Sequence, residues 1–177
     1  MIKDWPTIET DRLVLRLPGP DDYLLLRDLV ADPEVHRYLG PQPHDPTTDM
    51  FSRALRAAGS WQLYGYGMFL VFEKDGGTFV GQLGMFRSLR GFGKGLDHVA
   101  EAAWIVAREH WHKGYAREGM EAAFAWFEAA HGSQRIACMI EPENLASVAL
   151  AGKLGFVRYD RHTLDDGAAI DLFERLR

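Results

Sequence analysis

Two apolar segments separated by one amphipathic helix constrain this chain more than any other feature. Residues 99–106 and 136–140 are both apolar enough to be central strands of a sheet. Between them, apolar residues recur at helical spacing from Met120 to Phe127, and Gly132 is a typical helix stop. A strand, a helix and a strand in this order form a parallel pair with a right-handed crossover. The sheet is therefore expected to contain at least one parallel pair.

The rest of the chain reads as short strands and helices joined by turns. Strands are predicted at 13–17, 68–72, 79–86, 156–161 and 169–173, and helices at 22–30, 48–58 and 145–154, with Thr47 or Thr48 as the cap of the second helix. The expected class is mixed α/β (α+β), with a mostly antiparallel central sheet, one parallel βαβ unit and flanking helices. Residues 1–177 show no repeat or linker, and this length suits a single domain.

Composition limits the kind of protein this can be. The net charge is −5 at pH 7, whereas general nucleic-acid binders are usually basic. The single cysteine, Cys138, allows no disulfide within the chain and favours a reducing compartment. No signal core is present at the start, and no apolar run approaches the roughly 20 residues of a membrane span. We therefore expect a cytoplasmic monomer or homodimer with no nucleic-acid or membrane partner.

The first functional motif is residues 111–119, Trp-His-Lys-Gly-Tyr-Ala-Arg-Glu-Gly, where the first apolar strand gives way to the helix. The start of a helix carries unpaired N–H groups and a partial positive charge, so it binds phosphates. Gly114 permits close approach of the backbone, and Ala116 leaves the helix start uncluttered. The segment predicts a pyrophosphate site. The alternative is a tight turn whose small residues only pack the helix against the strand.

The second motif follows one strand later. Asn144 is a predicted N-cap for a helix that begins with Leu-Ala-Ser, and the helix ends at Lys153-Leu154-Gly155-Phe156 before the next strand. In their order and spacing, the two motifs together resemble the acetyl-CoA site of the GNAT superfamily of N-acetyltransferases.

The resemblance extends over nearly the whole chain. The superfamily's phosphate motif, Q/R-x-x-G-x-G/A, matches at Gly114 and Ala116, while Trp111 stands where Gln or Arg is usual. A tryptophan there is typical of the branch that acetylates ribosomal-protein N-termini, in runs that resemble W-G-K-G-Y-A. Residues 8–16 and 32–35 also resemble that branch.

The resemblance implies acetyl-CoA as the co-substrate, and we expect no metal. It assigns the diphosphate to the segment Trp111, His112, Lys113, Gly114, Tyr115, Ala116 and Arg117. In the family the two parallel strands splay apart, and the pantetheine arm pairs with the first strand as an added strand would. Trp104, Ile105 and Val106 are then expected to line that arm, with core packing as their other role. Asn144 is expected to cap its helix and to bond to coenzyme A.

Two residues are the predicted catalytic groups. Glu101 lies in an otherwise apolar strand, where burial disfavours the carboxylate anion and suits it to act as a base. The family often has a glutamate there, and the alternative is a solvent-facing position or a structural salt bridge. Many members carry a thiolate-protonating tyrosine where this chain has Ala151. Ser147 is the predicted substitute, with a purely local bond near the helix start as the alternative.

The sequence thus predicts an acetyl-CoA-dependent N-acetyltransferase that acts on a primary amine by direct attack in a ternary complex. The acceptor is a protein N-terminus or a small-molecule amine. Because this chain has no tyrosine at position 151, a non-catalytic acyl-CoA-binding or sensing module remains the alternative function. Cys138 is expected to be an inert core thiol. The basic loop with Arg87, Arg90 and Lys94 either attracts the 3′-phosphate or an acidic acceptor, or is simply solvated.

Overall fold

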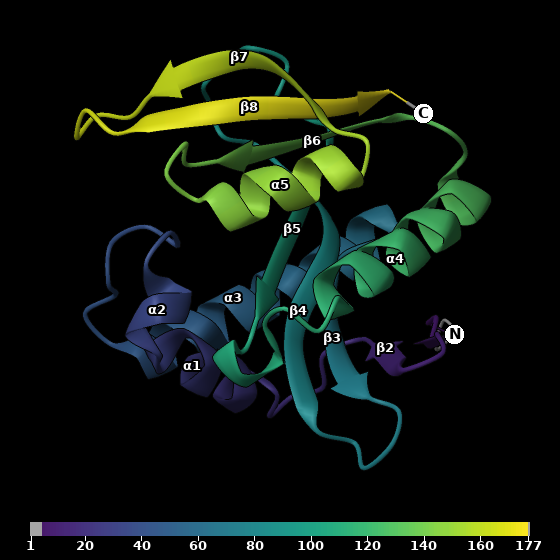
Figure 1. Ribbon diagram of the computed structural model, residues 1–177. Coiled ribbons are helices and arrows are strands. Elements are labelled where there is room, and N and C mark those ends of the chain that lie inside the picture. The colour runs from purple at the N-terminus through teal and green to yellow at the C-terminus, as the bar shows by residue number, and fades with distance from the viewer. Residues whose placement is uncertain (1–4, 177) are drawn as a thin grey trace.

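The computed structural model describes residues 5–176, which form one open sheet with helices on both sides (Figure 1). In sequence order the strands are β1 (Ile8–Glu9), β2 (Leu13–Arg16), β3 (Met68–Glu73), β4 (Phe79–Arg87), β5 (Ala100–Val106), β6 (Arg135–Ile140), β7 (Val157–Thr163) and β8 (Ala169–Leu176). The helices are α1 (Tyr23–Ala31), α2 (Pro33–His36), α3 (Pro46–Tyr64), α4 (Tyr115–His131) and α5 (Leu145–Lys153), and Arg108–His110 forms a 3₁₀ turn.

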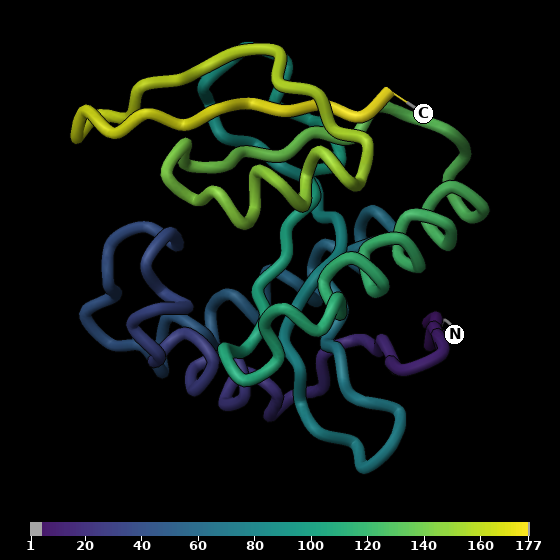
Figure 2. The backbone as a smooth tube through the Cα atoms, viewed as in Figure 1, coloured from purple at the N-terminus to yellow at the C-terminus, as the bar shows by residue number. Residues whose placement is uncertain are grey.

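The strand order is β1-β2-β3-β4-β5-β6-β8-β7. Within this sheet β5 and β6 pair in parallel, and the other neighbouring strands pair antiparallel. The mixed α/β class and the predicted βαβ unit are therefore confirmed. Figure 2 shows that the chain passes from the part with β1–β5 to the part with β6–β8 through α4.

Two apolar layers hold the helices on the sheet. On one face α4 buries Met120, Phe124 and Phe127 against strand residues such as Leu13 and Leu83. On the other face α1 and α3 contribute a second cluster around Leu70. Because side chains alternate along a strand, β5 serves both layers: Ala102 belongs to the α4 layer, whereas Ile105 packs in the α1 layer.

The start of α3 differs from the sequence prediction. The helix begins at Pro46, and its cap is Asp45, whose Oδ1 accepts from the N–H groups of Thr47 at 2.9 Å and Thr48 at 3.4 Å. The predicted caps, Thr47 and Thr48, already lie inside the first turn. Proline at the first helical position needs no N–H partner there, so Asp-Pro is a better start than Thr-Thr.

The parallel pair separates soon after it forms. Register pairs join Ala100 to Ile136 and Glu101 to Ala137, yet β5 continues to Val106 and β6 to Ile140 without further pairing between them. The predicted splay of these strands is therefore present, and it opens the sheet directly after Glu101. In the described part of the chain, no helix is long and apolar enough to cross a lipid bilayer.

Candidate active site

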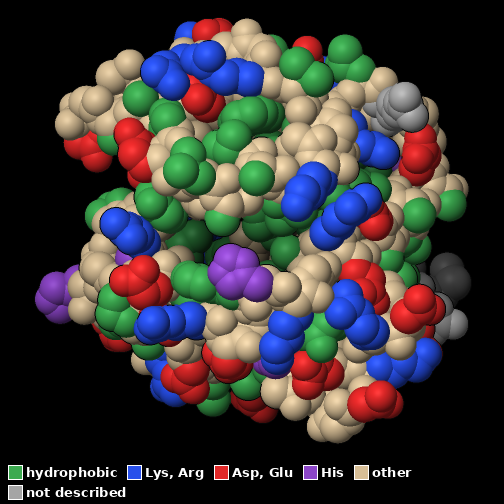
Figure 3. Space-filling view, in the orientation of Figure 1, with side chains coloured by type: hydrophobic (Ala, Val, Ile, Leu, Met, Phe, Trp, Pro, Cys, Tyr) green, Lys and Arg blue, Asp and Glu red, His purple; other side chains and the backbone are tan. Residues whose placement is uncertain are grey.

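A cleft of about 690 Å³ lies where β5 and β6 separate. Its walls come from α1 and α3, from the end of β4, from β5 and β6, and from the start of α5. The space-filling view shows the molecule hollowed between the part with α5 and β6–β8 and the part with α1–α3, with apolar side chains inside the hollow (Figure 3). Five predicted site residues line the cleft: Glu101, Trp104, Ile105, Asn144 and Ser147. The structure therefore brings both predicted catalytic residues into one cavity.

The turn into α4 presents a row of free main-chain N–H groups. Within residues 5–176, none of the N–H groups of residues 112–117 donates a hydrogen bond to another protein group. The helix's first internal bond comes one residue later, from Glu118 N to Gly114 O at 3.1 Å. His112 and Gly114 both have left-handed backbones, with φ of 60° and 81°. When left-handed residues alternate with residues of negative φ, successive N–H groups can point toward one anion.

Arg12, a residue that sequence reasoning did not single out, holds this turn in place. Its Nη1 donates to the carbonyl of Lys113 at 2.9 Å, and its Nε donates to Glu118 Oε2 at 2.7 Å. In a trans peptide the C=O and the following N–H point in opposite directions. The Arg12 bond therefore directs the N–H of Gly114 away from Arg12. Arg12 lies within residues 8–16, which resemble the family, but the sequence alone assigned no function to this segment.

Glu118 completes that anchor from the first turn of α4. Thr10 Oγ1 donates to Glu118 Oε1 at 2.6 Å, and the main-chain N–H of Arg12 donates to the same oxygen at 3.1 Å. Burial raises the pKa of Glu118, but the hydrogen bonds from Thr10 and Arg12 outweigh burial and hold it below its ordinary value. Glu118 is thus kept ionised, and it ties the turn between β1 and β2 to the helix start.

The side chains of the turn are mostly occupied by the protein itself. The Tyr115 hydroxyl donates to Glu73 Oε1 at 2.9 Å, and the Trp111 indole N–H donates to the carbonyl of Val106 at 2.8 Å. Lys113 Nζ lies 3.4 Å from His110 Nδ1. Each of these three side chains thus has a partner within the protein. The main chain is therefore the part of this segment that remains available to an anion.

Glu101 is buried, with its side chain only 3% exposed, and both of its oxygens accept from Arg90. Arg90 Nε lies 2.9 Å from Oε2, and Nη2 lies 2.5 Å from Oε1. This two-pronged pair offsets the cost of burying the carboxylate. Glu101 thus lines the cleft, as a catalytic base would. It also makes a salt bridge, which was the alternative role predicted for it.

The loop from β4 to β5 carries Arg90 to its partner. Asp97 Oδ1 accepts from the N–H groups of Arg90 and Gly91, at 2.5 and 2.9 Å. The bond from Gly91 is the main reason that the pKa of Asp97 lies below its ordinary value. Lys94 of this loop is also engaged, since it pairs with Asp160 at 3.1 Å. The loop is a folded wall of the cleft rather than a solvated basic tract.

Ser147 lies at the opposite wall and is held by two contacts. Its main-chain N–H donates to Asn144 Oδ1 at 3.2 Å, which confirms Asn144 as the N-cap of α5. Its Oγ accepts from the Trp104 indole N–H at 3.2 Å. An indole N–H can only donate, so the Ser147 oxygen is the acceptor and its own proton is free for a third group.

Two further residues bear on the chemistry. Ala151, where the family often has tyrosine, is fully buried, so position 151 faces the core rather than the cleft. Cys138 is 1% exposed, and burial, together with the charge of Glu101, raises the pKa of its thiol far above its ordinary value. A thiol that stays protonated is a poor nucleophile, so Cys138 does not suit an acyl-enzyme role.

Glu141 is a cleft residue that the sequence reading missed. It is half-buried at the end of β6, and burial is the main cause that raises its pKa, with the carboxylates of Glu143 and Asp166 adding to the effect. Its local sequence, Glu-Pro-Glu-Asn, gave no signal, because Asp166 comes close only through the hairpin between β7 and β8.

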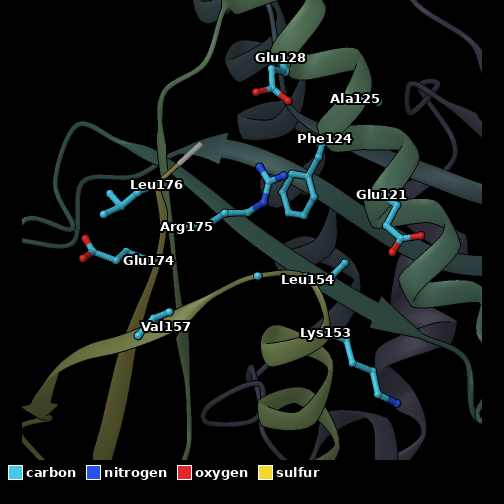
Figure 4. A pocket seen from close by; sticks show the side chains of 11 residues that line it. Glu121, Phe124, Ala125, Glu128, Lys153, Leu154, Val157, Glu174, Arg175 and Leu176 are labelled. Atoms are coloured by element: carbon cyan, nitrogen blue, oxygen red, sulfur yellow. The ribbon is translucent and has the colours of Figure 1, made fainter.

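A second hollow, of about 760 Å³, lies between α4 and the open end of the β7–β8 hairpin, where β7 begins and β8 ends (Figure 4). Arg175 lies over the ring of Phe124 there, with its guanidinium carbon 4.7 Å from the ring centre. None of the predicted site residues lines this hollow. Among the described residues there is also no cluster of His, Cys, Asp and Glu that could hold a metal ion.

Comparison with known proteins agrees with the geometry. Residues 12–157 match the model of the acetyltransferase (GNAT) domain. A Bordetella pertussis protein assigned to the GNAT acetyltransferases is 32% identical, with a TM-score of 0.85 over 96% of this chain and 99% of that one. YoaA of Bacillus subtilis (strain 168), named as an uncharacterized N-acetyltransferase, is 27% identical over 86% of this chain and 83% of its own.

The fold also recurs in RimL, a ribosomal L7/L12 α-N-protein acetyltransferase solved in complex with coenzyme A. RimL is 15% identical, and the match covers 97% of this chain and 98% of that one with a TM-score of 0.75. At this identity the match shows a shared fold. The domain match includes the turn at Gly114, Glu101 and Ser147. On these grounds the chain belongs to the GNAT family of acetyltransferases.

Proposed function

We propose that this protein is an acetyl-CoA-dependent N-acetyltransferase that transfers the acetyl group to a primary amine by direct attack in a ternary complex. One observation carries the proposal: β5 and β6 part directly after Glu101, and the turn that follows β5 offers free N–H groups from residues 112–117. A thioester with a long arm and a diphosphate needs both features.

The residues present fit acetyl-CoA. The free N–H groups at the start of α4 suit its diphosphate, because they need no basic side chain. Ala107 N donates to Val80 O on β4, so alternation along β5 directs the polar groups of Trp104 and Val106 toward the gap. The Trp111 indole already occupies the carbonyl of Val106. The main-chain groups of Trp104 and the N–H of Val106 therefore remain for the pantetheine arm.

Two proton transfers are needed for transfer to an amine. The attacking amine must lose a proton, and the departing thiolate must gain one or receive a strong hydrogen bond. We assign the first role to Glu101, directly or through a water, with Arg90 holding the carboxylate in place. We assign the second to Ser147, because the Trp104 indole uses its oxygen and leaves its hydroxyl proton free. Holding both substrates in one cleft supplies much of the remaining acceleration.

The experiment that tests this function follows release of the coenzyme A thiol with a panel of amines. Glu101→Gln is expected to lower kcat by about 10²–10⁴-fold, the usual contribution of a general base, while acetyl-CoA binding measured by calorimetry stays unchanged. Arg90→Lys is the matched variant, since it keeps a positive charge beside Glu101 but loses the forked pairing. It is expected to lower kcat less than Glu101→Gln does.

Two results would count against the proposal. If the wild-type protein binds acetyl-CoA but transfers acetyl to no amine, the chain is a binding module rather than an enzyme. If Glu101→Gln keeps full kcat, Glu101 is not the base, and Glu141 is then the carboxylate of the cleft to vary next.

A further inference from the structure

Arginines dominate the charged lining of the cleft, although the chain as a whole carries a net charge of −5. The positively charged residues that line it are Arg53, Arg56, Arg87 and Arg90, and the negatively charged ones are Glu101 and Glu141. A concave site lined by one sign of charge concentrates its field on whatever enters.

Two of these arginines are neutralised by the protein. Arg90 pairs with Glu101, and Arg53 pairs with Asp49 one turn earlier on α3, with Nε 2.7 Å from Oδ2. The pair between Arg90 and Glu101 matters most, because it cancels the carboxylate nearest to the predicted chemistry. An anionic ligand therefore meets little repulsion from Glu101.

Arg56 and Arg87 have no carboxylate partner within residues 5–176. Arg56 is exposed and lies three residues after Arg53, on the same side of α3. Arg87 ends β4 and follows Phe86, the residue that stands opposite Glu101 in the sheet. Its guanidinium carbon lies 5.3 Å from the centre of the Tyr64 ring.

Arg87 also lies near enough to the hydroxyl of Tyr66 to influence its ionisation. Burial raises the pKa of Tyr66, and the hydrogen bond with Arg87 opposes that rise. The contact with the Tyr64 ring orients Arg87 without neutralising it. A guanidinium that is positioned but not paired with a charge is well suited to bind a carboxylate or phosphate with two hydrogen bonds.

Among the described residues, the carboxylate of the cleft that has no arginine partner, Glu141, lies on the wall formed by β6. Glu141 directly follows β6, with Glu143 and Asp166 close enough to act on it electrostatically. The cleft is thus polarised, with unpaired arginines on the side of α3 and β4 and carboxylates on the side of β6. An acceptor with an ammonium group and an anionic group has a favourable orientation in such a field.

We infer that the acceptor amine carries a carboxylate or another anionic group, which Arg56 and Arg87 bind. This inference rests on the proposed acetyl transfer and narrows its acceptor to anionic amines, including peptides with acidic residues after the N-terminus. Amines that carry positive charge alone, such as polyamines, are disfavoured because Arg56 and Arg87 repel them.

The test compares acceptors that differ in charge but little in shape. One set is Ala-Glu-Glu, Ala-Gln-Gln and Ala-Lys-Lys, each with an amidated C-terminus, and a second pair is β-alanine and β-alaninamide. We measure kcat/KM for each at saturating acetyl-CoA. The anionic member of each set is expected to be preferred over its neutral counterpart by about tenfold, as for one well-placed charged hydrogen bond.

Variants then locate the source of that preference. Arg56→Gln and Arg87→Gln are each expected to reduce the ratio of anionic to neutral kcat/KM, and the double variant to abolish it. Arg53→Gln is the matched control, because Arg53 already has Asp49 as its partner, and it is expected to keep the wild-type ratio. Higher ionic strength is expected to weaken the preference.

The outcomes separate this inference from the function on which it rests. Equal or better turnover of the neutral or cationic acceptors overturns the inference and leaves acetyl transfer intact. So does a wild-type ratio in the double variant. An absence of turnover with every amine, in a protein that binds acetyl-CoA, overturns the transfer itself.

Discussion

At the scale of single residues, Arg12 shows how a distant side chain can build a binding site that it does not enter. It lies 101 positions before Lys113, more than half of the chain, yet it donates to the Lys113 carbonyl and pairs with Glu118. Both contacts act on the turn that bears the free N–H groups. We therefore regard Arg12 as a positioning residue for the diphosphate.

Arg12→Gln is expected to raise KM for acetyl-CoA by roughly five- to tenfold, because a charged hydrogen bond that orients the turn is lost. The change in kcat is expected to be less than twofold, since the residues assigned to chemistry lie on other walls. Steady-state kinetics with varied acetyl-CoA checks this. Arg16→Gln is the matched control, because Arg16 lies four residues after Arg12, at the end of β2, but pairs with Asp22 and does not touch the turn. Equal effects of the two substitutions on KM would contradict a positioning role.

At the scale of elements, the contact of α4 with the sheet depends on a residue without a side chain. A Cβ at Gly119 would come within 2.6 Å of Leu83 Cδ2, a side chain that is itself buried. Gly119 thus lets the helix approach β4 closely.

Gly119→Val is expected to lower the free energy of unfolding by about 1–3 kcal/mol, because the added methyl groups overpack the layer between α4 and β4. Gly152→Ala is the comparison. Gly152 lies in α5 with no atom within 4 Å of an added Cβ, so alanine there is expected to stabilise by up to ~1 kcal/mol through helix propensity. Urea denaturation of both variants measures the difference. A Gly119→Val protein as stable as wild type would show that Leu83 moves aside without cost.

At the scale of the whole molecule, depressed carboxylate pKa values connect stability to pH. Hydrogen bonds from Arg161 and Arg158 hold the pKa of Asp171 below its ordinary value of 3.8, although burial opposes them. The Arg16 guanidinium does the same for Asp22. A carboxylate whose pKa is lower in the folded state stabilises the fold above its ordinary pKa, and that stabilisation is lost as the pH falls through the folded value.

The free energy of unfolding is therefore expected to stay level from neutral pH down to about pH 5 and to fall below it, as the unfolded chain takes up protons first. Asp171→Asn is expected to be less stable than wild type at pH 7 and to lose stability less steeply in acid. The measurement is denaturant unfolding at a series of pH values. Asp28→Asn, which removes an exposed carboxylate paired with its neighbour Arg27, is expected to follow the wild-type curve. If the free energy of unfolding of Asp171→Asn changes with pH as steeply as that of wild type, the ion pairs of Asp171 with Arg158 and Arg161 do not contribute to the pH dependence.

Local signals in the sequence were enough to predict most of the fold. Apolar periodicity located β5, α4 and β6 to within a residue or two, and it implied their parallel crossover. Strong local chemistry placed Gly114 before the start of α4 and Asn144 as the cap of α5. The start of α3 was predicted wrongly because two threonines outweighed an Asp-Pro pair that lay just before them.

The sequence by itself determined the family resemblance, the class of the fold and the positions of the two motifs, because these depend on residues that are neighbours along the chain or repeat at a fixed period. Only the tertiary structure decided which side chains meet. It paired Glu101 with Arg90, aimed the Trp104 indole at Ser147 and joined Arg12 to the turn before α4. Among residues 5–176, it also left Arg56 and Arg87 without a carboxylate partner while neutralising Arg53 and Arg90. Such pairings depend on sheet order and loop folding, which bring together residues far apart in sequence, so no local pattern encodes them.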